Sequence, residues 1–555
     1  MHFIVRLGLL SVVLMVAASL QAAVDGVVNA RILTLDADRT EASALAWDAS
    51  GRIVHLGDAE SLTEAYPELE ASDLDGKVVL PGLIDAHGHV MGLGLARLQA
   101  DLVGAESVEE VIKRLRDHAG NLPDKAWLTG RGWDQTRWEG SEFPSRADLD
   151  EAFPDRPVYL VRIDGHAAWV NSAAMAHATE DLSGDWQPQG GHIHRDEEEK
   201  PTGILIDTAM PYVADAMPEP TAEERELALD LALTEIARYG LTGVHDAGAS
   251  LADFRLFRQR DQAGELSVRI HALADGDAEM LDWLCENGTY TGERLTARGV
   301  KLYTDGALGS RGAALLEDYS DDPGNSGLLF HSDEELQAMV DRAMSCGLQL
   351  GIHAIGDAAN RQVIEALAAG RDNHPDNPGR HRIEHVQIIA VEDIPRMAEH
   401  AIIASMQPIH ATSDMRWAED RVGSERLVGA YAWQRVLDAD VHLALGSDFP
   451  VEPVNPWLGI HAAVTRQDRE GNPQGGWLSD QRLSVDEALR AFTIDAAFAG
   501  FAEADTGTLE AGKYADFIVI DADPWKIDAS DLAGIEVLQT VIGGEIVFEG
   551  TDQVN

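Results

Sequence analysis

The chain has 555 residues, of which 45% are hydrophobic and 25% charged, and its formal net charge is −52 at pH 7. The length predicts one large domain with a smaller one beside it, and the composition is typical of soluble globular proteins. The negative charge argues against nucleic acids and anionic membrane surfaces as partners, because both would repel the chain. We therefore expect a small-molecule substrate, with assembly into a homo-oligomer left open.

The N-terminus is typical of an export signal. Arg6 supplies a positive charge, residues 7–18 are apolar, and residues 20–22 offer a cleavage site. Because the apolar stretch is short for a membrane span, we expect cleavage near Ala22 rather than an uncleaved anchor or a buried strand. The sequence predicts a signal peptide over residues 1–22, no membrane contact after its removal, and a location outside the cytoplasm, most simply a bacterial periplasm.

Short β-like runs, separated by turn residues, occur near both ends of the mature chain. They cover residues 27–33, 52–56, 516–521, 536–542 and 545–548. We expect residues 23–80 and 505–555 to form one small β-sandwich domain, which the large middle segment interrupts.

The middle segment, residues 81–504, alternates candidate strands with helical stretches such as 221–239 and 332–345. This alternation predicts an α/β fold with a (β/α)8 TIM-type barrel. The eight candidate strands end near His87, His245, Leu273, Thr304, His353, His385, Met406 and Asp448. A ninth apolar run, residues 157–163, is assigned to a long insertion after barrel strand 1, roughly residues 100–220.

Cys285 and Cys346 are the only cysteines, and they lack CxxC spacing. They form either one disulfide in an oxidising compartment or two buried free thiols, and the sequence leaves both alternatives open. A cysteine-based metal site or a cysteine nucleophile has little support.

The most informative motif is His87-Gly-His89, which follows the apolar run 78–80. Side chains two residues apart on a strand point the same way, so these two imidazoles would converge on one point, as metal ligands do. Two histidines near a strand end are also common without a metal, so the motif alone leaves both interpretations open.

Polar residues lie at or near the ends of other predicted barrel strands. They are Lys301, His353, His385 and Asp448. Each has an ordinary explanation on its own, such as a histidine bonded to backbone or an aspartate in a turn. Because the carboxyl ends of barrel strands open onto one face, the six side chains could gather around one or two cations, and imidazole and carboxylate ligands suit Zn²⁺.

The order of these residues resembles the amidohydrolase superfamily of metal-dependent hydrolases. Other stretches are similar to its amidohydrolase-3, or YtcJ-like, branch, and they cover residues 164–171, 201–205, 302–311 and 352–357. The closing stretch, residues 507–516, resembles the superfamily's usual return to the β-domain. The resemblance covers nearly everything after the signal peptide.

The resemblance implies two divalent metal ions, most simply Zn²⁺. It implies as their ligands His87, His89, Lys301, His353, His385 and Asp448. Lys301 would be a carbamate that bridges the two ions. Carbamate formation needs a neutral amine, and burial in an apolar strand near cations lowers a lysine pKa.

The function implied by this resemblance is hydrolysis of a non-peptide C–N bond in an amide, including N-acyl and N-formyl amines. A metal-activated hydroxide would attack the carbonyl carbon, and Asp448 would shuttle the proton to the leaving nitrogen. A cyclic amide, carbamate or ester is the alternative substrate. An exported binding protein with an inactive barrel is the alternative that is not an enzyme. Deamination is disfavoured, because deaminases of this superfamily usually bind one metal and lack the lysine.

Three further residues are candidates for substrate contacts. Arg311 could bind a substrate carboxylate, or it could tie down its own glycine-rich loop. His166 and Trp169, in the insertion, could form the wall of a lid, or they could belong to a packed insertion core. His245 and Asp246, at the end of the second strand, are expected to be structural.

Overall fold

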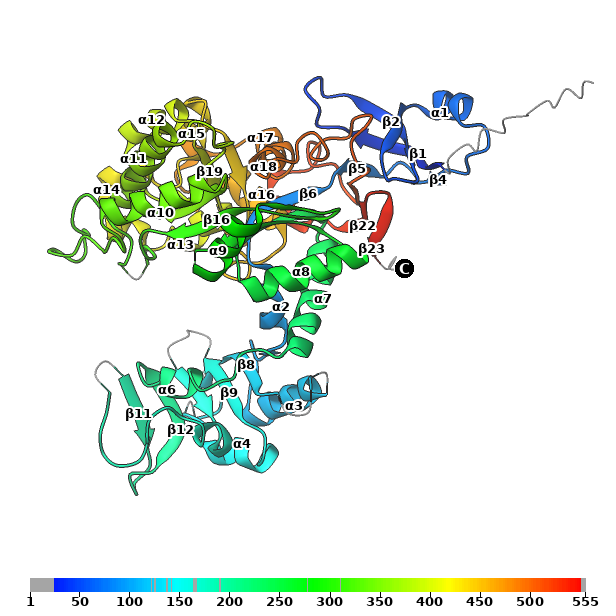
Figure 1. Ribbon diagram of the computed structural model, residues 1–555. Helices are drawn as coiled ribbons and strands as arrows, with labels where there is room; N and C mark the ends of the chain where they lie inside the picture. The colour runs from blue at the N-terminus through cyan, green and yellow to red at the C-terminus, as the bar shows by residue number, and fades with distance from the viewer. Residues whose placement is uncertain are drawn as a thin grey trace, which may run out of the picture.

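The computed structural model describes residues 24–550, except 121, 124–125, 136–137, 141, 163–166, 189–190, 277 and 310. The predicted signal peptide, residues 1–22, lies outside this range. Within the described residues the strands form three sheets, which are a barrel, a sheet built from both chain ends and a sheet in the insertion (Figure 1). No helix in this part of the chain combines the length and the apolar character that a membrane span requires.

The barrel consists of eight parallel strands that pair in chain order. They are β6 (Leu83–Gly88), β13 (Leu241–Ala249), β14 (Arg269–Asp275), β16 (Leu295–Tyr303), β17 (Gln349–Ala354), β18 (Arg382–His385), β19 (Ile403–Met406) and β20 (Leu443–Leu445). The last strand returns beside the first, since the backbone N–H of Asp448 donates to the carbonyl of His87 at 2.7 Å. All eight predicted strands are confirmed, and the barrel is nearly closed. A short strand, β15 (Tyr290–Thr291), pairs with β16 at its start.

Helices cover the outside of the barrel, which explains why its strands are apolar on both faces. They are α7 (Ala222–Arg238), α8 (Leu251–Ala263), α9 (Ala278–Asn287), α10 (Asp333–Ser345), α11 (Asp357–Asn373), α12 (Ile394–Glu399), α13 (Pro408–Asp414), α14 (Ala418–Arg426), α15 (Trp433–Asp438), α16 (Pro456–Thr465), α17 (Val485–Ala491) and α18 (Ile494–Ala499). Short 3₁₀ helices cover Val391–Asp393, Leu427–Gly429, Ser479–Gln481 and Ala529–Gly534.

Both helices predicted from the sequence are confirmed, and each begins with a capping box. The hydroxyl of Thr221 accepts from the backbone N–H of Glu224, whose carboxylate accepts from the backbone N–H of Thr221. Ser332 and Glu335 make the same pair of bonds at the start of α10.

Strands from the two chain ends share one sheet. It contains β1 (Val24–Leu33), β2 (Glu41–Asp48), β3 (Ile53–Gly57), β4 (Ser72–Asp73), β5 (Val78–Pro81), β21 (Phe517–Ile520), β22 (Val537–Ile542) and β23 (Glu545–Glu549). The two ends join where β5 pairs antiparallel with β21, and helix α1 (Ala59–Ala65) packs on β2. The expected pairing of the two ends is therefore present, with all eight strands in one hydrogen-bonded sheet. The domain boundaries and the sandwich form remain predictions.

The segment between β6 and β13 forms a separate body of its own. Its sheet contains β7 (Ala100–Asp101), β8 (Leu128–Trp133), β9 (Val158–Arg162), β10 (Ala167–Val170), β11 (Gly191–Arg195) and β12 (Pro201–Asp207), with helices α3 (Val108–Ala119), α4 (Arg146–Ala152), α5 (Ser172–Met175) and α6 (Pro211–Ala214). The apolar run predicted to lie in the insertion is β9 of this sheet.

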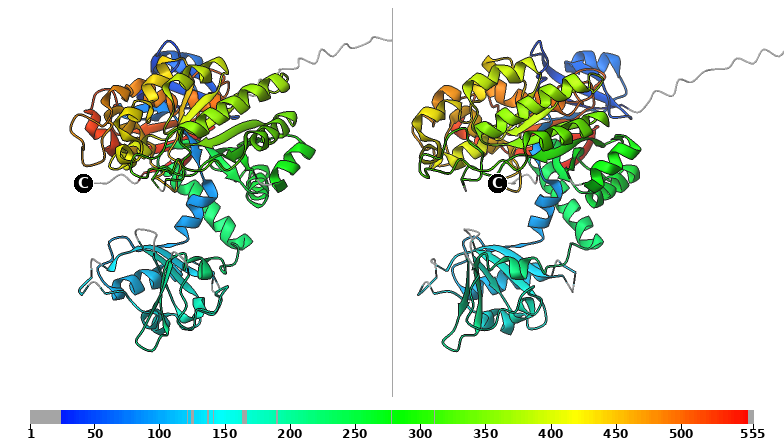
Figure 2. Two further views of the ribbon diagram at one scale, coloured as in Figure 1. Left: turned by 90° about the vertical axis from the view of Figure 1, so that its left-hand side faces the viewer. Right: turned by 60° about the vertical axis from the view of Figure 1, so that its left-hand side comes forward.

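Two helices carry the insertion away from the barrel (Figures 1 and 2). They are α2 (Val90–Arg97), which leaves β6, and α7, which leads back to β13. The two pack so closely that a Cβ on Gly94 would lie 2.0 Å from the carbonyl oxygen of Ala228. Only glycine permits this approach without a backbone shift.

Cys285 of α9 and Cys346, which caps α10, form a disulfide with a sulfur–sulfur distance of 2.04 Å. Of the two alternatives left open by the sequence, the structure has the bonded one.

Candidate metal centre

The six predicted ligands come from the carboxyl ends of five barrel strands. His87 and His385 lie on β6 and β18, and Lys301 and His353 lie on β16 and β17. His89 follows β6 directly, and Asp448 lies three residues after the end of β20. The carboxyl ends of parallel barrel strands meet on one face, which accounts for their approach across 360 residues of chain.

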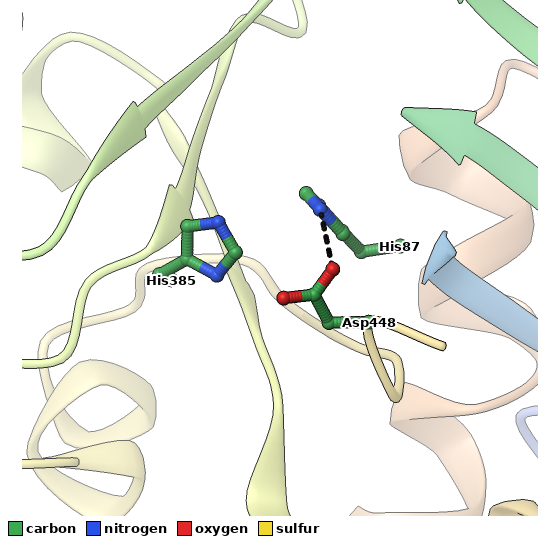
Figure 3. A group of neighbouring side chains, drawn as sticks. All are labelled: His87, His385 and Asp448. Atoms are coloured by element: carbon green, nitrogen blue, oxygen red, sulfur yellow. Dashed lines mark ion pairs between the residues drawn. The ribbon is translucent and has the colours of Figure 1, made fainter. Parts of the chain in front are cut away.

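Three of these side chains make the tightest group. One ligand atom from each of His87, His385 and Asp448 lies within 4.8 Å of the others, and all three side chains are buried. Figure 3 shows the two imidazoles and the carboxylate turned toward a common point, with Nε2 of His87 3.5 Å from Oδ1 of Asp448.

The other three predicted ligands surround this group. Nε2 of His89 lies 3.0 Å from Oδ1 of Asp448, and the His353 ring centroid lies 4.6 Å from that of His385. Lys301 is buried and interacts electrostatically with Asp448. The structure thus brings all six residues together, and their roles as ligands remain a prediction.

The polar atoms at the centre fit a divalent cation. Nε2 of His87 is buried and has no hydrogen-bond partner among the described residues, and Nε2 of His353, which also has none, lies 3.4 Å from Oδ1 of Asp305. Buried polar atoms in folded proteins are nearly always bonded, so each such exception needs an explanation. Imidazole lone pairs beside a carboxylate are the donor set that Zn²⁺ and related ions bind.

Burial sets the protonation of the centre. It lowers the pKa of His87 to about 4 and holds the pKa of His385 well below its ordinary value, so both imidazoles are in the neutral, metal-binding form. Burial also lowers the pKa of Lys301, although the carboxylates of Glu384 and Asp448 oppose the shift. The shift favours the neutral amine that carbamate formation needs.

A buried ion pair orients His87. Its Nδ1–H donates to Oε2 of Glu384 at 2.6 Å, and Arg382 donates to the same oxygen at 2.9 Å. Arg382 also donates to the hydroxyl of Ser405, to the carbonyl of Ala86 and, at 2.7 Å, to Nδ1 of His245. Because Nδ1 of His87 is held by Glu384, Nε2 faces the centre.

Two further supporting residues are absent from the sequence predictions. The side-chain oxygen of Gln407 accepts from Nδ1 of His385 at 2.8 Å and fixes that ring in the same way. His410, on α13, lies 3.2 Å from Oδ2 of Asp448 through Nε2 and 3.6 Å from a carboxylate oxygen of Glu452 through Nδ1. Burial alone would lower the pKa of His410, but these two carboxylates raise it to about 10.

Comparison with known proteins identifies the family. The model of the amidohydrolase family matches residues 70–548. The chain belongs to the amidohydrolase family. It is 35% identical over 526 residues to the putative amidohydrolase YtcJ of Bacillus subtilis, covering 93% of this chain and 97% of that protein.

Two other amidohydrolase relatives are informative. An N-substituted formamide deformylase of Arthrobacter pascens is 30% identical over 556 residues, covering 95% of this chain and 98% of the enzyme. The crystal structure of an uncharacterized metal-dependent hydrolase from Pyrococcus furiosus is 30% identical and superposes with a TM-score of 0.77, covering 91% of this chain and all of that one. The protein is therefore a hydrolase of the metal-dependent amidohydrolase superfamily.

The structure also places the candidate substrate contacts of this amidohydrolase. Arg311 pairs with Asp321 of its own loop through two bonds of 3.0 and 2.8 Å, the arrangement expected of a residue that ties down the loop. Trp169 is completely buried and donates to the carbonyl of Ser145, so it lies in the packed core of the insertion and offers no surface to a substrate. His166 lies outside the described residues. The carboxylate of Asp246 accepts from the backbone N–H of Val90 at 2.7 Å, which is a structural role.

Proposed function

We propose that this amidohydrolase cleaves a non-peptide C–N bond in an amide, such as an N-acyl or N-formyl amine. The observation that carries the proposal is the buried group of His87, His385 and Asp448 at the barrel mouth, in which Nε2 of His87 has no partner among the described residues. The formamide deformylase, similar along nearly its whole length, supports the C–N bond as the target.

We propose that two divalent ions, most simply Zn²⁺, are held at this centre. The residues that would hold them are His87, His89, Lys301, His353, His385 and Asp448. When bound, such ions lower the pKa of a water molecule and polarise a carbonyl oxygen. Lys301 would serve as a carbamate: its neutral amine attacks CO₂, one C–N bond forms and one proton is lost. The resulting anion would supply a negatively charged ligand to the ions.

Asp448 is suited to move the proton. Its Oδ1 faces the centre, near Nε2 of His87 and of His89, while its Oδ2 faces His410. With Oδ2 held by the imidazole N–H of His410, Oδ1 is the oxygen that would accept a proton from the attacking water and deliver it to the leaving nitrogen. His410 and Glu452 would keep the carboxylate in this orientation.

Metal analysis combined with an activity screen tests the proposal. The protein is stripped with a chelator, reloaded with Zn²⁺ or Mn²⁺, and assayed for amine release from N-acyl amines and N-formyl amines, with cyclic amides and esters in parallel. We expect two equivalents of metal and release of amine from open-chain amides. Turnover of cyclic amides or esters alone would favour the alternative substrates, and a protein that binds no metal and turns over nothing would favour the binding protein.

Intact-mass measurement tests the carbamate separately. A metal-loaded, active sample should be heavier than its sequence by one CO₂, and Lys301→Ala should lack that increment. An unmodified lysine in an active, metal-loaded sample would rule out the bridge.

We further propose that the protein is exported. The disulfide between Cys285 and Cys346 supports this, because disulfides persist mainly in oxidising compartments. Expression of the full chain followed by N-terminal sequencing should give a mature protein that begins close to Ala23. An intact N-terminus in the cytoplasmic fraction would contradict export.

A further inference from the structure

One edge of the barrel mouth carries exposed apolar side chains. Leu328, Leu329 and Phe330 are consecutive in the connection between β16 and α10, and Tyr303 is the last residue of β16. Their exposed fractions are 63% for Leu328, 49% for Phe330 and 38% for Tyr303. On the surface of a chain with a net charge of −52, exposed apolar residues that lie close in the fold are candidates for contact with another apolar group.

One residue of this group, Tyr303, adjoins the candidate metal centre. Tyr303 lies two residues after Lys301 on β16, so both side chains point to the same face of the strand. Nζ of Lys301 lies 4.6 Å from the centroid of the Tyr303 ring, and the His353 ring centroid lies 5.7 Å from it. The Tyr303 ring therefore forms the layer between these residues and solvent.

Backbone pairing places Phe330 next to the end of β16, and Leu328 and Leu329 directly precede it in the chain. The N–H of Phe330 donates to the carbonyl of Thr304 at 2.8 Å, and the N–H of Thr304 donates to the carbonyl of His353 at 3.1 Å. The main chain of Phe330 is thus fixed at the end of β16, while half of its side chain stays exposed. None of the four side chains belongs to the buried core of the described barrel.

One exposed apolar residue follows β20, across the barrel from β16, and the arginine in the loop after β16 pairs with an acid. Val451, three residues after Asp448, is among the most exposed apolar residues. Arg311 pairs with Asp321, and the same carboxylate also pairs with Arg421. A substrate whose reacting bond reaches the centre would therefore place apolar atoms along this edge.

We infer that Tyr303, Leu328, Leu329 and Phe330 bind an uncharged alkyl or aryl substituent of the substrate. The inference rests on the proposed function, because it takes the reacting amide to lie at the metal centre. It specifies the substrate class as amides that carry, on one side of the C–N bond, an apolar group of several carbon atoms. Binding sites for small molecules are commonly lined in this way, with a few polar groups at one end.

The test is a series of amides that differ only in chain length. The ratio kcat/KM is measured for N-formyl-n-alkylamines from methyl to hexyl, and for N-methylamides of straight-chain acids over the same range. For one of the two series we expect kcat/KM to rise by about 3- to 4-fold per added methylene, since burying one CH₂ favours the complex by that factor. Phe330→Ser, Leu328→Ser and Tyr303→Ala should each make this rise shallower.

Two variants serve as controls. Tyr303→Phe keeps the ring and should keep the wild-type slope, whereas loss of the slope would mean that the hydroxyl, and not the apolar ring, recognises the substrate. Ile546→Ser removes an apolar side chain that is 57% exposed on β23, in the terminal sheet, and should change nothing.

Binding without turnover separates this inference from the proposed function. The affinity of the metal-loaded protein for butanamide through octanamide is measured by calorimetry. If no amide is hydrolysed but affinity rises with chain length in the wild type and not in Phe330→Ser, the hydrolase proposal fails and the apolar site stands. Hydrolysis of amides with flat chain-length dependence overturns the apolar site alone. The apolar site is also overturned if the serine variants keep the wild-type dependence of kcat/KM on chain length but change the molar mass measured by light scattering. The four residues would then form an interface between copies of the chain.

Discussion

Oε2 of Glu384 lies 2.6 Å from Nδ1 of His87, and both side chains are fully buried. The bond links β18 to β6 through the barrel interior, and Arg382 supplies the compensating charge. A carboxylate that holds the distal nitrogen of a ligand histidine fixes the ring and raises its basicity. Glu384 is therefore a positioning residue for His87.

We expect Glu384→Gln to weaken metal binding by about 10- to 100-fold, because His87 loses the carboxylate that orients it. The substitution should also lower the free energy of unfolding by about 3 kcal/mol, since Arg382 keeps a buried charge without its partner. Metal retention in competition with a chelator measures the first effect, and calorimetric melting measures the second.

The matched control is Glu392→Gln. Glu392 is an exposed acid that pairs with Arg361 at 2.9 Å on the surface, and such pairs contribute about 0–1 kcal/mol. Metal retention in this variant should equal that of the wild type. If Glu384→Gln retains metal equally well, Glu384 does not orient a ligand.

Asp448→Asn should keep the fold and the metal but lose about 10²- to 10⁴-fold in kcat, because an amide cannot accept the proton. The substitution is mild for the backbone: Asp448 has a φ of +63°, and asparagine is among the residues that tolerate this region. Single-turnover kinetics on metal-matched samples measures the loss.

Asp440→Asn provides the comparison for that variant. Asp440 has a φ of +58° and lies exposed just before β20, so the same change is made in the same backbone conformation, away from the centre. Its kcat should match the wild type. A full rate in Asp448→Asn would remove Asp448 from proton transfer.

The strands could be predicted because they are short apolar runs, and the residues of the centre could be predicted because they lie at or shortly after the ends of five of these strands. The residues that orient the side chains of the centre could not be predicted from the sequence. Strand alternation puts Glu384 and His385 on opposite faces, yet both contact His87. The alternation of side chains ends at His385, which has a φ of +80°. No local sequence pattern predicts this change of backbone conformation.

His410 illustrates a second limit. It lies on a helix after β19 and not at a strand end, so its approach to Asp448 depends on how the loops of strands 7 and 8 pack together. Trp169 illustrates a third limit of sequence-based prediction. Its burial depends on how the insertion folds, and the sheet of the insertion is separate from the barrel sheet.

Removal of the disulfide should lower stability without lowering activity. The bond joins residues 61 positions apart, and closing a loop of that size stabilises a folded chain by about 2–4 kcal/mol. The double variant Cys285→Ser/Cys346→Ser should melt at a lower temperature than the oxidised wild type. A reductant should lower the wild-type melting temperature and leave the double variant unaffected. Equal melting of oxidised and reduced wild type would show that the bond adds nothing.

His271 should make the protein sensitive to mild acid. Its Nδ1 lies 2.9 Å from the hydroxyl of Thr296 and its Nε2 lies 3.0 Å from the side-chain oxygen of Gln349. Burial lowers the pKa of His271 to about 4, from the ordinary value of 6.5. Below pH 6.5 the unfolded chain binds a proton at this histidine that the folded chain does not bind. The free energy of unfolding therefore decreases as the pH falls from 6.5 toward 4, by about 3 kcal/mol in all.

The non-titrating variant His271→Gln isolates this effect from the protonation of the many carboxylates. The wild type should exceed the variant in melting temperature at neutral pH, and the difference should shrink steadily as the pH falls from 6.5 toward 4. His177→Gln, at an exposed histidine of the insertion, should instead run parallel to the wild type over the whole range. If the His271→Gln curve were also parallel, the folded protein would accept the proton at position 271, and the imidazole could not be held neutral by its surroundings.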